Sequence, residues 1–515
     1  MSSTLKKNRN LVFCIFILSL LFKPLWLFNN QNLGIPGDDM SYWLHSATIA
    51  FDYDLDYKND YKFDSNIFNS ETNVPSHPPG AGYLASPFVF LFSQLEKVID
   101  NSVETTRSNP VKSFAYLGFF ASGLFYTYLG TFFLSKIVKR FNNKYSGLVI
   151  FCGLLSSLVH FVSTRFLMAH AAEFFLCSTL IYIFEKNKDK PFNKIETLLL
   201  LTTYFFLAIT RPSTFLYSLI LIFVYRDKFK FNSKSIVISF GEFSLFSAIY
   251  ILLSRKLYKK NFMLMNTYGE NMNEYTSTIN IEQFLNGFLK LPNLFFSTNM
   301  GVIFSTPIVF LGVIILFTKQ FRNNENKLRV FYLFLYFGAS SLPLLIWQGR
   351  EVAYGQRLLV GIIPLSTLLV CKYLSDHRQI IITKFLTFFT YIGYLLFYSS
   401  EKLTLKSGVT LWGTQVGFTA ENYYIEVIKA FTNYETILSA ILRNIYVVDF
   451  LKLFNLRNFL NDSSFLVSIN TEQVSSFLIY ADVYYNLNIY YLAIVNVLIF
   501  LFSYAYAKLI FSLNN

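Results

Sequence analysis

Charged residues are scarce in this chain. Only 15% of its 515 residues are charged, whereas 53% are hydrophobic and 19% are aromatic. A soluble domain carries roughly 25% charged residues, so the composition excludes an ordinary water-soluble protein. Apolar runs recur from residue 11 to residue 511, each close to the ~20 residues that cross a bilayer as a helix. They do not alternate as the strands of a β-barrel do. We predict an all-α polytopic membrane protein.

Cysteine is also scarce, and its placement excludes two further classes of site. The four cysteines all lie inside apolar runs, without the spacing of a metal site or of a disulfide framework. We therefore expect small buried apolar side chains. The net charge of +13 does not indicate nucleic acid binding, because Lys and Arg collect in the cytoplasmic loops of membrane proteins. We expect no nucleic acid partner and a lipid bilayer around the chain.

The apolar runs and the charges between them predict a topology. The first run has no small-residue cleavage site after it, so we interpret it as an uncleaved anchor that follows a cytoplasmic N-terminus. Run 81–95 is short and contains Pro87, which favours a helix along the outer face. If it does not cross, the basic loops 136–144, 226–234 and 319–329 all become cytoplasmic, as the positive-inside rule requires. The predicted spans are 11–28, 113–135, 145–163, 167–184, 195–209, 212–225, 235–254, 301–318, 330–347, 357–374, 380–398 and 488–511.

This topology divides the chain into three parts. Residues 1–398 form a transmembrane catalytic module that includes a first outer loop at 29–80. Residues 399–487 form an extracytoplasmic segment, and residues 488–515 form the last transmembrane helix and a tail. With the site facing the periplasm or exterior, we place the protein in the plasma (inner) membrane. The polar residues that stand out, Asp38–Asp39, Arg211 and Arg357 among them, then fall on the outer side.

Two adjacent acids follow the first span. Asp38 and Asp39 come directly after Gly34, Pro36 and Gly37, at a boundary where an aspartate commonly caps a helix. A cap requires only one acid. The second carboxylate is free to bind a cation or to act as a base. The local sequence leaves both interpretations open.

The first outer loop resembles that of the GT-C-fold glycosyltransferases, which include protein O-mannosyltransferases and lipid A aminoarabinose transferases. The resemblance rests on GDDMSYWLHSATIAFDYDLDY, which begins at Gly37, followed by PSHPPGAGYLASPFVFLF, which begins at Pro75. Family members carry an acidic pair after the first span, an aromatic juxtamembrane helix, and a Pro-Pro motif that opens a second helix. Weaker matches follow in order up to residue 375, and residues 399–515 resemble no family that we identify.

The resemblance implies a GT-C-like bundle of about 12–13 transmembrane helices and a polyprenyl-phosphate sugar donor. A glycan, lipid or protein hydroxyl of the cell envelope would attack the sugar with inversion. Asp38 would be the general base. Asp39 would hold the loop or bind a divalent cation, which is the one cofactor candidate. Ser76 replaces an acid that the aminoarabinose transferases use for metal binding, and this leaves metal dependence undecided.

Cationic groups should surround the leaving phosphate. Arg211 and Arg357 are predicted at outer ends of spans, and a guanidinium donates to phosphate in pairs. Tyr354 precedes Arg357 as a further substrate-binding candidate. His77 occupies the place of a lysine in the aminoarabinose transferases. His170 is also a candidate, although a histidine in an apolar stretch is more often a buried, hydrogen-bonded side chain. Arg165 we interpret as an interfacial anchor.

Two other functions are also compatible with a chain that has many predicted spans and outer loops. A polyprenyl-linked glycan polymerase or ligase would have paired arginines in a late outer loop and no early acidic pair. A lipid-linked substrate transporter or flippase would place ionisable residues near the midplane and often show internal repeats. The early acids favour the transferase over the first alternative, and the scarcity of charge in the spans favours it over the second.

Overall fold

The structure is a computed structural model of the whole chain. It describes residues 3–22, 37–59, 72–99, 113–141, 143–187, 192–226, 233–259, 261, 289, 291–296, 301–346, 356–374, 376–399, 428, 432 and 489–513. Structural statements below concern these residues. Tyr354 and nearly all of the predicted segment 399–487 lie outside them.

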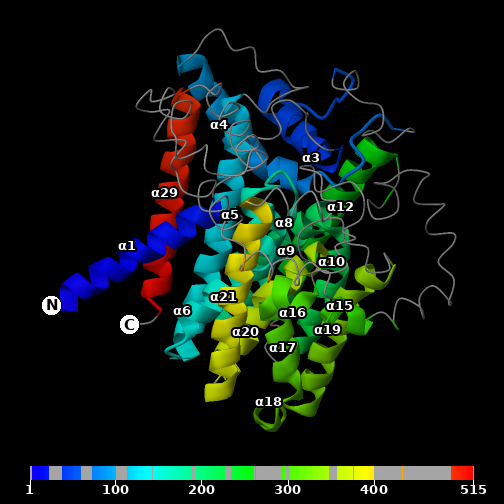
Figure 1. Cartoon of the computed structure of the whole chain (residues 1–515). Coiled ribbons are helices and arrows are strands. Elements are labelled where there is room, and N and C mark those ends of the chain that lie inside the picture. Colours follow the sequence, from blue (N-terminus) through cyan, green and yellow to red (C-terminus); the bar gives the residue numbers. More distant parts are fainter. Residues whose placement is uncertain are drawn as a thin grey trace, which may run out of the picture.

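The described part of the chain is all-helical, as the composition predicts (Figure 1). Its first half contains α1 (Ser3–Phe22), α3 (Gly37–Ala47), η1 (Thr48–Asp52), α4 (Gly80–Ile99), α5 (Phe114–Val138), η4 (Lys139–Phe141), α6 (Ser146–Leu154), α7 (Ser157–Ser163), α8 (His170–Lys186), α9 (Lys194–Thr210), α10 (Pro212–Ser218), α11 (Ile220–Val224) and α12 (Ser233–Tyr258).

The second half begins with short helices and ends beside the start of the chain. It contains α15 (Leu291–Phe296), α16 (Val302–Ser305), α17 (Pro307–Phe317), α18 (Lys319–Asn324), α19 (Lys327–Ile346), η7 (Arg357–Ile362), α20 (Ile363–Tyr373), α21 (His377–Ser399) and α29 (Ile489–Phe511). Figure 1 shows α29, in red, beside α1, in blue, and the two helices contact each other.

Several predicted spans are broken helices. Run 145–163 was expected to be one span, and instead forms α6 and α7, which meet at 61°. The cause is local. The Ser156 hydroxyl donates to the Gly153 carbonyl at 2.7 Å and accepts from the Leu158 amide at 3.3 Å, so it ends one helix and caps the next. At Arg211–Pro212 the expected break is confirmed, because α9 ends at Thr210 and α10 starts at Pro212.

The protein is a membrane protein by the length and apolarity of its helices. Among the described residues, two helices are long and apolar enough to cross a bilayer, Phe114–Phe141 and Tyr490–Phe511, and the bent pair α6–α7 would be a third span. Helix α4 is longer than the 15-residue run suggested. Whether it crosses the membrane, and whether the chain has twelve spans, remain predictions.

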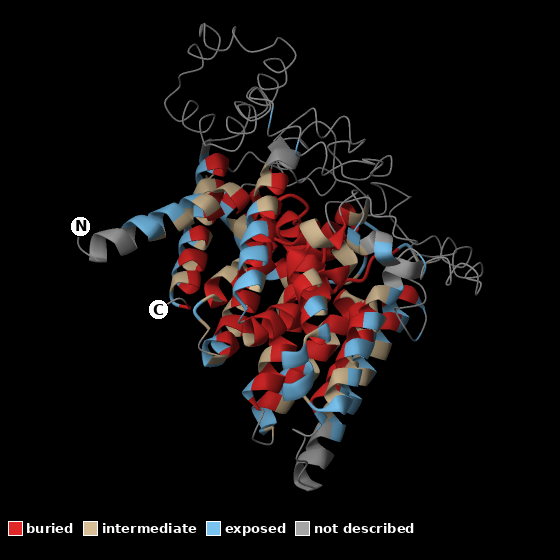
Figure 2. Ribbon diagram, turned by 60° about the horizontal axis from the view of Figure 1, so that its bottom comes forward, coloured by how far each residue is buried: buried red, intermediate tan, exposed pale blue. Residues whose placement is uncertain are grey.

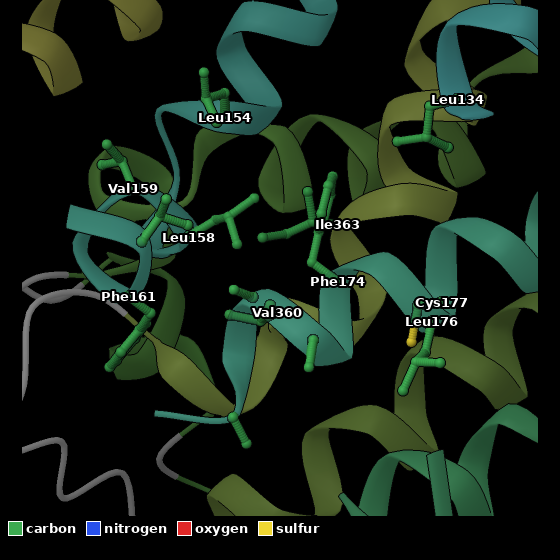
Figure 3. Packing of buried hydrophobic residues seen from close by; sticks show 14 of the residues in the cluster. Leu134, Leu154, Leu158, Val159, Phe161, Phe174, Leu176, Cys177, Val360 and Ile363 are labelled. Atoms are coloured by element: carbon green, nitrogen blue, oxygen red, sulfur yellow. The ribbon is translucent and has the colours of Figure 1, made fainter. Parts of the chain in front are cut away.

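One apolar core joins the helices of the described part of the chain. Figure 2 shows buried residues through the middle of the bundle and exposed residues along its outer helices. Val360 and Ile363, from the η7–α20 segment, belong to the same buried cluster as Leu158 of α7 and Phe174 of α8 (Figure 3). This core fixes η7 against α7 and α8, and therefore fixes where Arg357 begins η7.

Close helix approach at two glycines positions the start of α4. A side chain at Gly82 of α4 would come within 2.6 Å of the His45 Cβ in α3, and one at Gly80 within 2.3 Å of the Thr210 hydroxyl at the end of α9. Only glycine allows these approaches. Gly80, the last residue of the Pro-Pro-Gly motif, thus lies against the α9–α10 break, and Gly82 lies against α3.

Candidate active site

The two neighbouring acids of α3 have different surroundings. Both lie in its first turn, where a negative charge complements the helix dipole. Consecutive helix positions point in different directions, and the side chain of Asp38 is 40% exposed while that of Asp39 is 2% exposed. The pair therefore consists of one reachable carboxylate and one buried carboxylate.

Asp39 is paired with Arg165, from the connection between α7 and α8. The Arg165 Nε donates to Asp39 Oδ2 at 3.0 Å, and its Nη2 donates to the same oxygen. The Arg165 side chain is 2% exposed, so the interpretation of Arg165 as an interfacial anchor is wrong. A buried ion pair of this kind fixes α3 against the α7–α8 connection, because separating it would leave an uncompensated charge inside the protein.

Asp38 faces two cationic or protonatable groups. Its Oδ1 lies 3.6 Å from His77 Nε2, and its Oδ2 lies 3.6 Å from Arg357 Nη1. Burial raises the pKa of Asp38, but His77, Arg357 and Arg165 outweigh it and lower the pKa to about 2. The carboxylate is therefore ionised at neutral pH.

Three arginines of the site influence the pKa of His77. Burial lowers the pKa of its imidazole; Asp38 raises it, and the positive charges of Arg357, Arg211 and Arg165 lower it further. His77 is therefore mostly neutral at pH 7 and gains its charge at lower pH, where it acts on Asp38 together with Arg357 and Arg165. On its other side, His77 Nδ1 lies 3.3 Å from the Ser76 hydroxyl.

A third acid, Glu173 of α8, holds Arg211. Its Oε2 lies 3.4 Å from Arg211 Nε and 2.9 Å from His170 Nδ1, and its Oε1 accepts from the Thr214 hydroxyl at 2.5 Å. Glu173 is fully buried. His170 is thus a buried, hydrogen-bonded histidine that contacts the acid holding Arg211.

Glu173 was not among the residues that sequence reasoning selected. A detectable signal existed: an acid near the start of an apolar helix, three residues after a histidine, needs a buried partner. Glu173 also lies against η7, since a side chain at Gly361 would come within 2.9 Å of its Oε1. It therefore touches both the Arg211 turn and the short helix that begins with Arg357.

The donor set does not fit a divalent cation held by Asp39. Its carboxylate is occupied by the Arg165 guanidinium, and no group of three or more His, Cys, Asp or Glu side chains in the described ranges is arranged to hold a metal ion. We derive no step through a metal.

Comparison with known proteins gives a distant structural likeness. No family model matches the chain, and no curated protein matches it. A crystal structure of the Archaeoglobus fulgidus oligosaccharyltransferase, tethered through a disulfide to an acceptor peptide with the NVT sequon, is similar at 13% identity and a TM-score of 0.43. That match covers 92% of this chain and 58% of the other. The apo form of the same enzyme matches at 13% identity and a TM-score of 0.42, covering 93% and 59%. This chain thus spans under three fifths of their length.

Proposed function

We propose that this chain is a GT-C-type membrane glycosyltransferase. It moves a sugar from a polyprenyl-phosphate donor to an acceptor hydroxyl at the extracytoplasmic face, with inversion. The observation that carries the proposal is the meeting of Asp38 and Arg357, whose charged atoms lie 3.6 Å apart although they come from distant parts of the sequence. A reachable carboxylate beside a guanidinium supplies the two groups that such a transfer requires.

The reaction balances with these groups. The acceptor oxygen attacks the anomeric carbon and forms the new C–O bond, while the bond from that carbon to the phosphate oxygen breaks. The acceptor proton passes to an oxygen of Asp38. The polyprenyl phosphate leaves with one more negative charge than it carried as a diester, and Arg357 stabilises that charge.

Arg357 has two roles, one before the donor binds and one after. In the free protein it lies beside Asp38 and is one of the groups that lower the pKa of that carboxylate, which makes Asp38 a weak base. A donor phosphate competes for the same guanidinium. As Arg357 turns to the phosphate, Asp38 loses a positive neighbour and its pKa rises. Binding of the donor thereby strengthens the base that the reaction needs.

Arg211 is the second phosphate-binding group. Its side chain is 12% exposed, so it is largely enclosed but can present part of its guanidinium to a ligand. Glu173 neutralises its charge from the buried side. This arrangement fixes the direction in which Arg211 donates, since a guanidinium held on one edge presents the other.

The test begins with the donor. Loss of the gene should cause one polyprenol-linked sugar to accumulate in the membrane, detectable by mass spectrometry of the lipid extract. That lipid, incubated with the purified protein and a membrane extract from the deletion strain, should lose its sugar. If no polyprenol-linked sugar accumulates and none is consumed, the proposal is wrong.

A further inference from the structure

One face of α3 contacts His77 at three successive turns. Asp38, Tyr42 and His45 are spaced by four and three residues, so they share a face of the helix. Asp38 approaches the His77 ring at 3.6 Å. Tyr42 packs beside the same imidazole, with ring centroids 5.2 Å apart. His45 reaches the main chain of His77.

The hydrogen bonds of His45 determine its tautomer. Its Nε2 lies 2.8 Å from the His77 carbonyl oxygen, and its Nδ1 lies 2.6 Å from the Tyr57 hydroxyl. A carbonyl only accepts, so Nε2 carries the hydrogen and Nδ1 accepts from Tyr57. His45 is fully buried, and burial lowers its pKa to about 3. The imidazole is therefore neutral, with both nitrogens engaged.

The His77 carbonyl has a second donor from a distant helix. The Tyr258 hydroxyl, near the end of α12, donates to the same oxygen at 3.0 Å. A carbonyl oxygen has two lone pairs, and His45 and Tyr258 engage both. The close approach of Gly82 to His45 keeps α4 tight against this point. Three helices thus contribute to holding one peptide group.

We propose that His45 is a positioning residue that holds the His77 imidazole against Asp38 through the His77 carbonyl. The inference rests on the function proposed above, in which Asp38 is the base. Tyr57 acts through His45, because its hydroxyl keeps the hydrogen on Nε2. Tyr258 acts in parallel from α12. His45 itself touches neither Asp38 nor a substrate.

The first test is independent of catalysis. The chain has five histidines, so isotope-labelled histidine gives few ring signals, and single substitutions assign them by NMR in bilayers. His45 should remain a neutral Nε2–H tautomer between about pH 5 and pH 8. His45→Phe should shift the His77 ring signals. The control His377→Gln, at an exposed position in α21, should leave them unchanged. Titration of His45 in this range, or unmoved His77 signals in His45→Phe, would overturn the proposal.

The second test separates positioning from folding. His45→Phe preserves an aromatic ring but donates nothing, and we expect kcat to fall between about tenfold and 100-fold with KM nearly unchanged. His45→Gln retains an amide donor near the position of Nε2 and should recover most of that loss. His45→Phe should also move the acid limb of the pH–rate profile upward, because Asp38 loses His77 as a neighbour and remains beside Arg357 and Arg165.

The outcomes distinguish this inference from the proposed function. If the wild-type protein consumes no polyprenol-linked sugar, the function is wrong while the NMR test still decides the role of His45. If the wild type is active and His45→Phe has unaltered kcat and pH profile, the positioning role is wrong and the function stands. Equal losses in His45→Phe and His45→Gln would likewise contradict a role that depends on the donated hydrogen bond.

Discussion

The two ends of helix α8 carry charged clusters that differ in how tightly their ions are paired. Glu173 and Glu185 lie on this helix about 18 Å apart along its axis, at 1.5 Å per residue. We call the two groups the Asp38 cluster (Asp38, Asp39, His77, Arg165, Glu173, Arg211 and Arg357) and the Glu325 cluster (Glu185, Tyr225, Glu325, Arg329, Lys372 and Tyr373). Figure 1 shows the corresponding ends of the molecule, with α3 near the top and α18 at the bottom.

The Glu325 cluster is closed. Glu325 Oε1 lies 2.5 Å from Lys372 Nζ, and its Oε2 lies 3.2 Å from Arg329 Nη1. The other acid, Glu185, accepts from the Tyr225 hydroxyl at 3.0 Å and lies 3.4 Å from Arg329 Nη2. The Glu325 side chain is 7% exposed. Acids and bases here neutralise one another at short range, and the cluster joins α8, α11, α19 and α20.

The Asp38 cluster is closed on its buried side and open on its exposed side. Asp39 is paired with Arg165, and Glu173 contacts Arg211, His170 and Thr214. Asp38 lies 3.6 Å from Arg357 and remains 40% exposed. A carboxylate that a ligand can reach, and the guanidinium beside it, can exchange partners when a ligand arrives. The comparison teaches that charge in an apolar protein is not by itself a sign of function. An ion pair whose carboxylate is exposed to a ligand is the more specific sign.

The largest effect on activity is expected from substitution of Asp38, in the Asp38–Arg357 pair. Asp38→Asn removes the proposed base but preserves the shape of the side chain, and we expect sugar transfer to fall by about 10²–10⁴-fold. Consumption of the purified polyprenol-linked sugar measures it. The melting temperature of the variant in detergent should remain near that of the wild type. Full activity in Asp38→Asn would remove Asp38 as the base.

Substitution of the neighbouring Asp39 should lower the stability of the protein rather than its rate of sugar transfer. Asp39→Ala leaves the buried Arg165 without a counter-charge, and we expect a loss of about 3–5 kcal/mol of stability. Unfolding of the purified protein should show it directly. Replacing both partners in Asp39→Ala/Arg165→Met should recover part of the loss, because no charge is then stranded. A stable, inactive Asp39→Ala variant would instead indicate that Asp39 takes part in the reaction.

The sequence alone could not predict that Asp38 and Asp39 differ in burial and in their partners. The sequence indicated the acidic pair and the break at Arg211, because each depends on local patterns of charge and proline. It indicated that Arg211 and Arg357 lie at helix ends. It could not indicate which aspartate meets Arg165, since that depends on how α3 rotates against the α7–α8 connection, a matter of packing between distant segments.

The helix breaks show the same limit. Run 145–163 reads as one apolar span because hydropathy averages over Gly153 and Ser156. The bend arises from hydrogen bonds of a single hydroxyl. Arg165 follows that bend in the chain, so the hydropathy pattern could not predict its burial either. Glu173 was overlooked because its partners, Thr214 and Arg211, come from a different helix pair.

Substitution of Arg357 tests whether the Asp38–Arg357 pair exchanges partners when the donor binds. Arg357→Gln should lower sugar transfer by about 10²-fold, because the leaving phosphate loses one cationic donor. Arg357→Lys retains the charge without the planar fork and should lose less. Binding of polyprenyl phosphate, measured by its protection against thermal unfolding, should weaken in the order wild type, Lys, Gln. Unchanged protection in Arg357→Gln would show that the phosphate is held elsewhere.

The closed cluster should contribute to stability alone. Glu325→Gln keeps the size of the side chain and removes the charge shared by Lys372 and Arg329, and we expect a loss of about 2 kcal/mol. Sugar transfer by the folded protein should equal that of the wild type at a temperature where both are folded. A change in kcat without a change in melting temperature would overturn the division between the two clusters.

The smallest expected effect is on the pH dependence of the melting temperature, and it should differ between the Asp38 cluster and the Glu325 cluster. Asp38 has its pKa lowered from 3.8 to about 2, and the pKa of Glu325 is also lowered from 4.5. A lowered folded-state pKa contributes stability above the unfolded value, and this contribution is lost as the pH falls through the folded value. The melting temperature should therefore decline below about pH 4.5, and each variant, Asp38→Asn or Glu325→Gln, should remove its own part of the decline. Adding polyprenyl phosphate should move only the Asp38 part to higher pH, because the phosphate draws Arg357 away from that carboxylate while the closed cluster keeps its partners. A ligand-induced shift that persists in Asp38→Asn would place the responsive acid elsewhere.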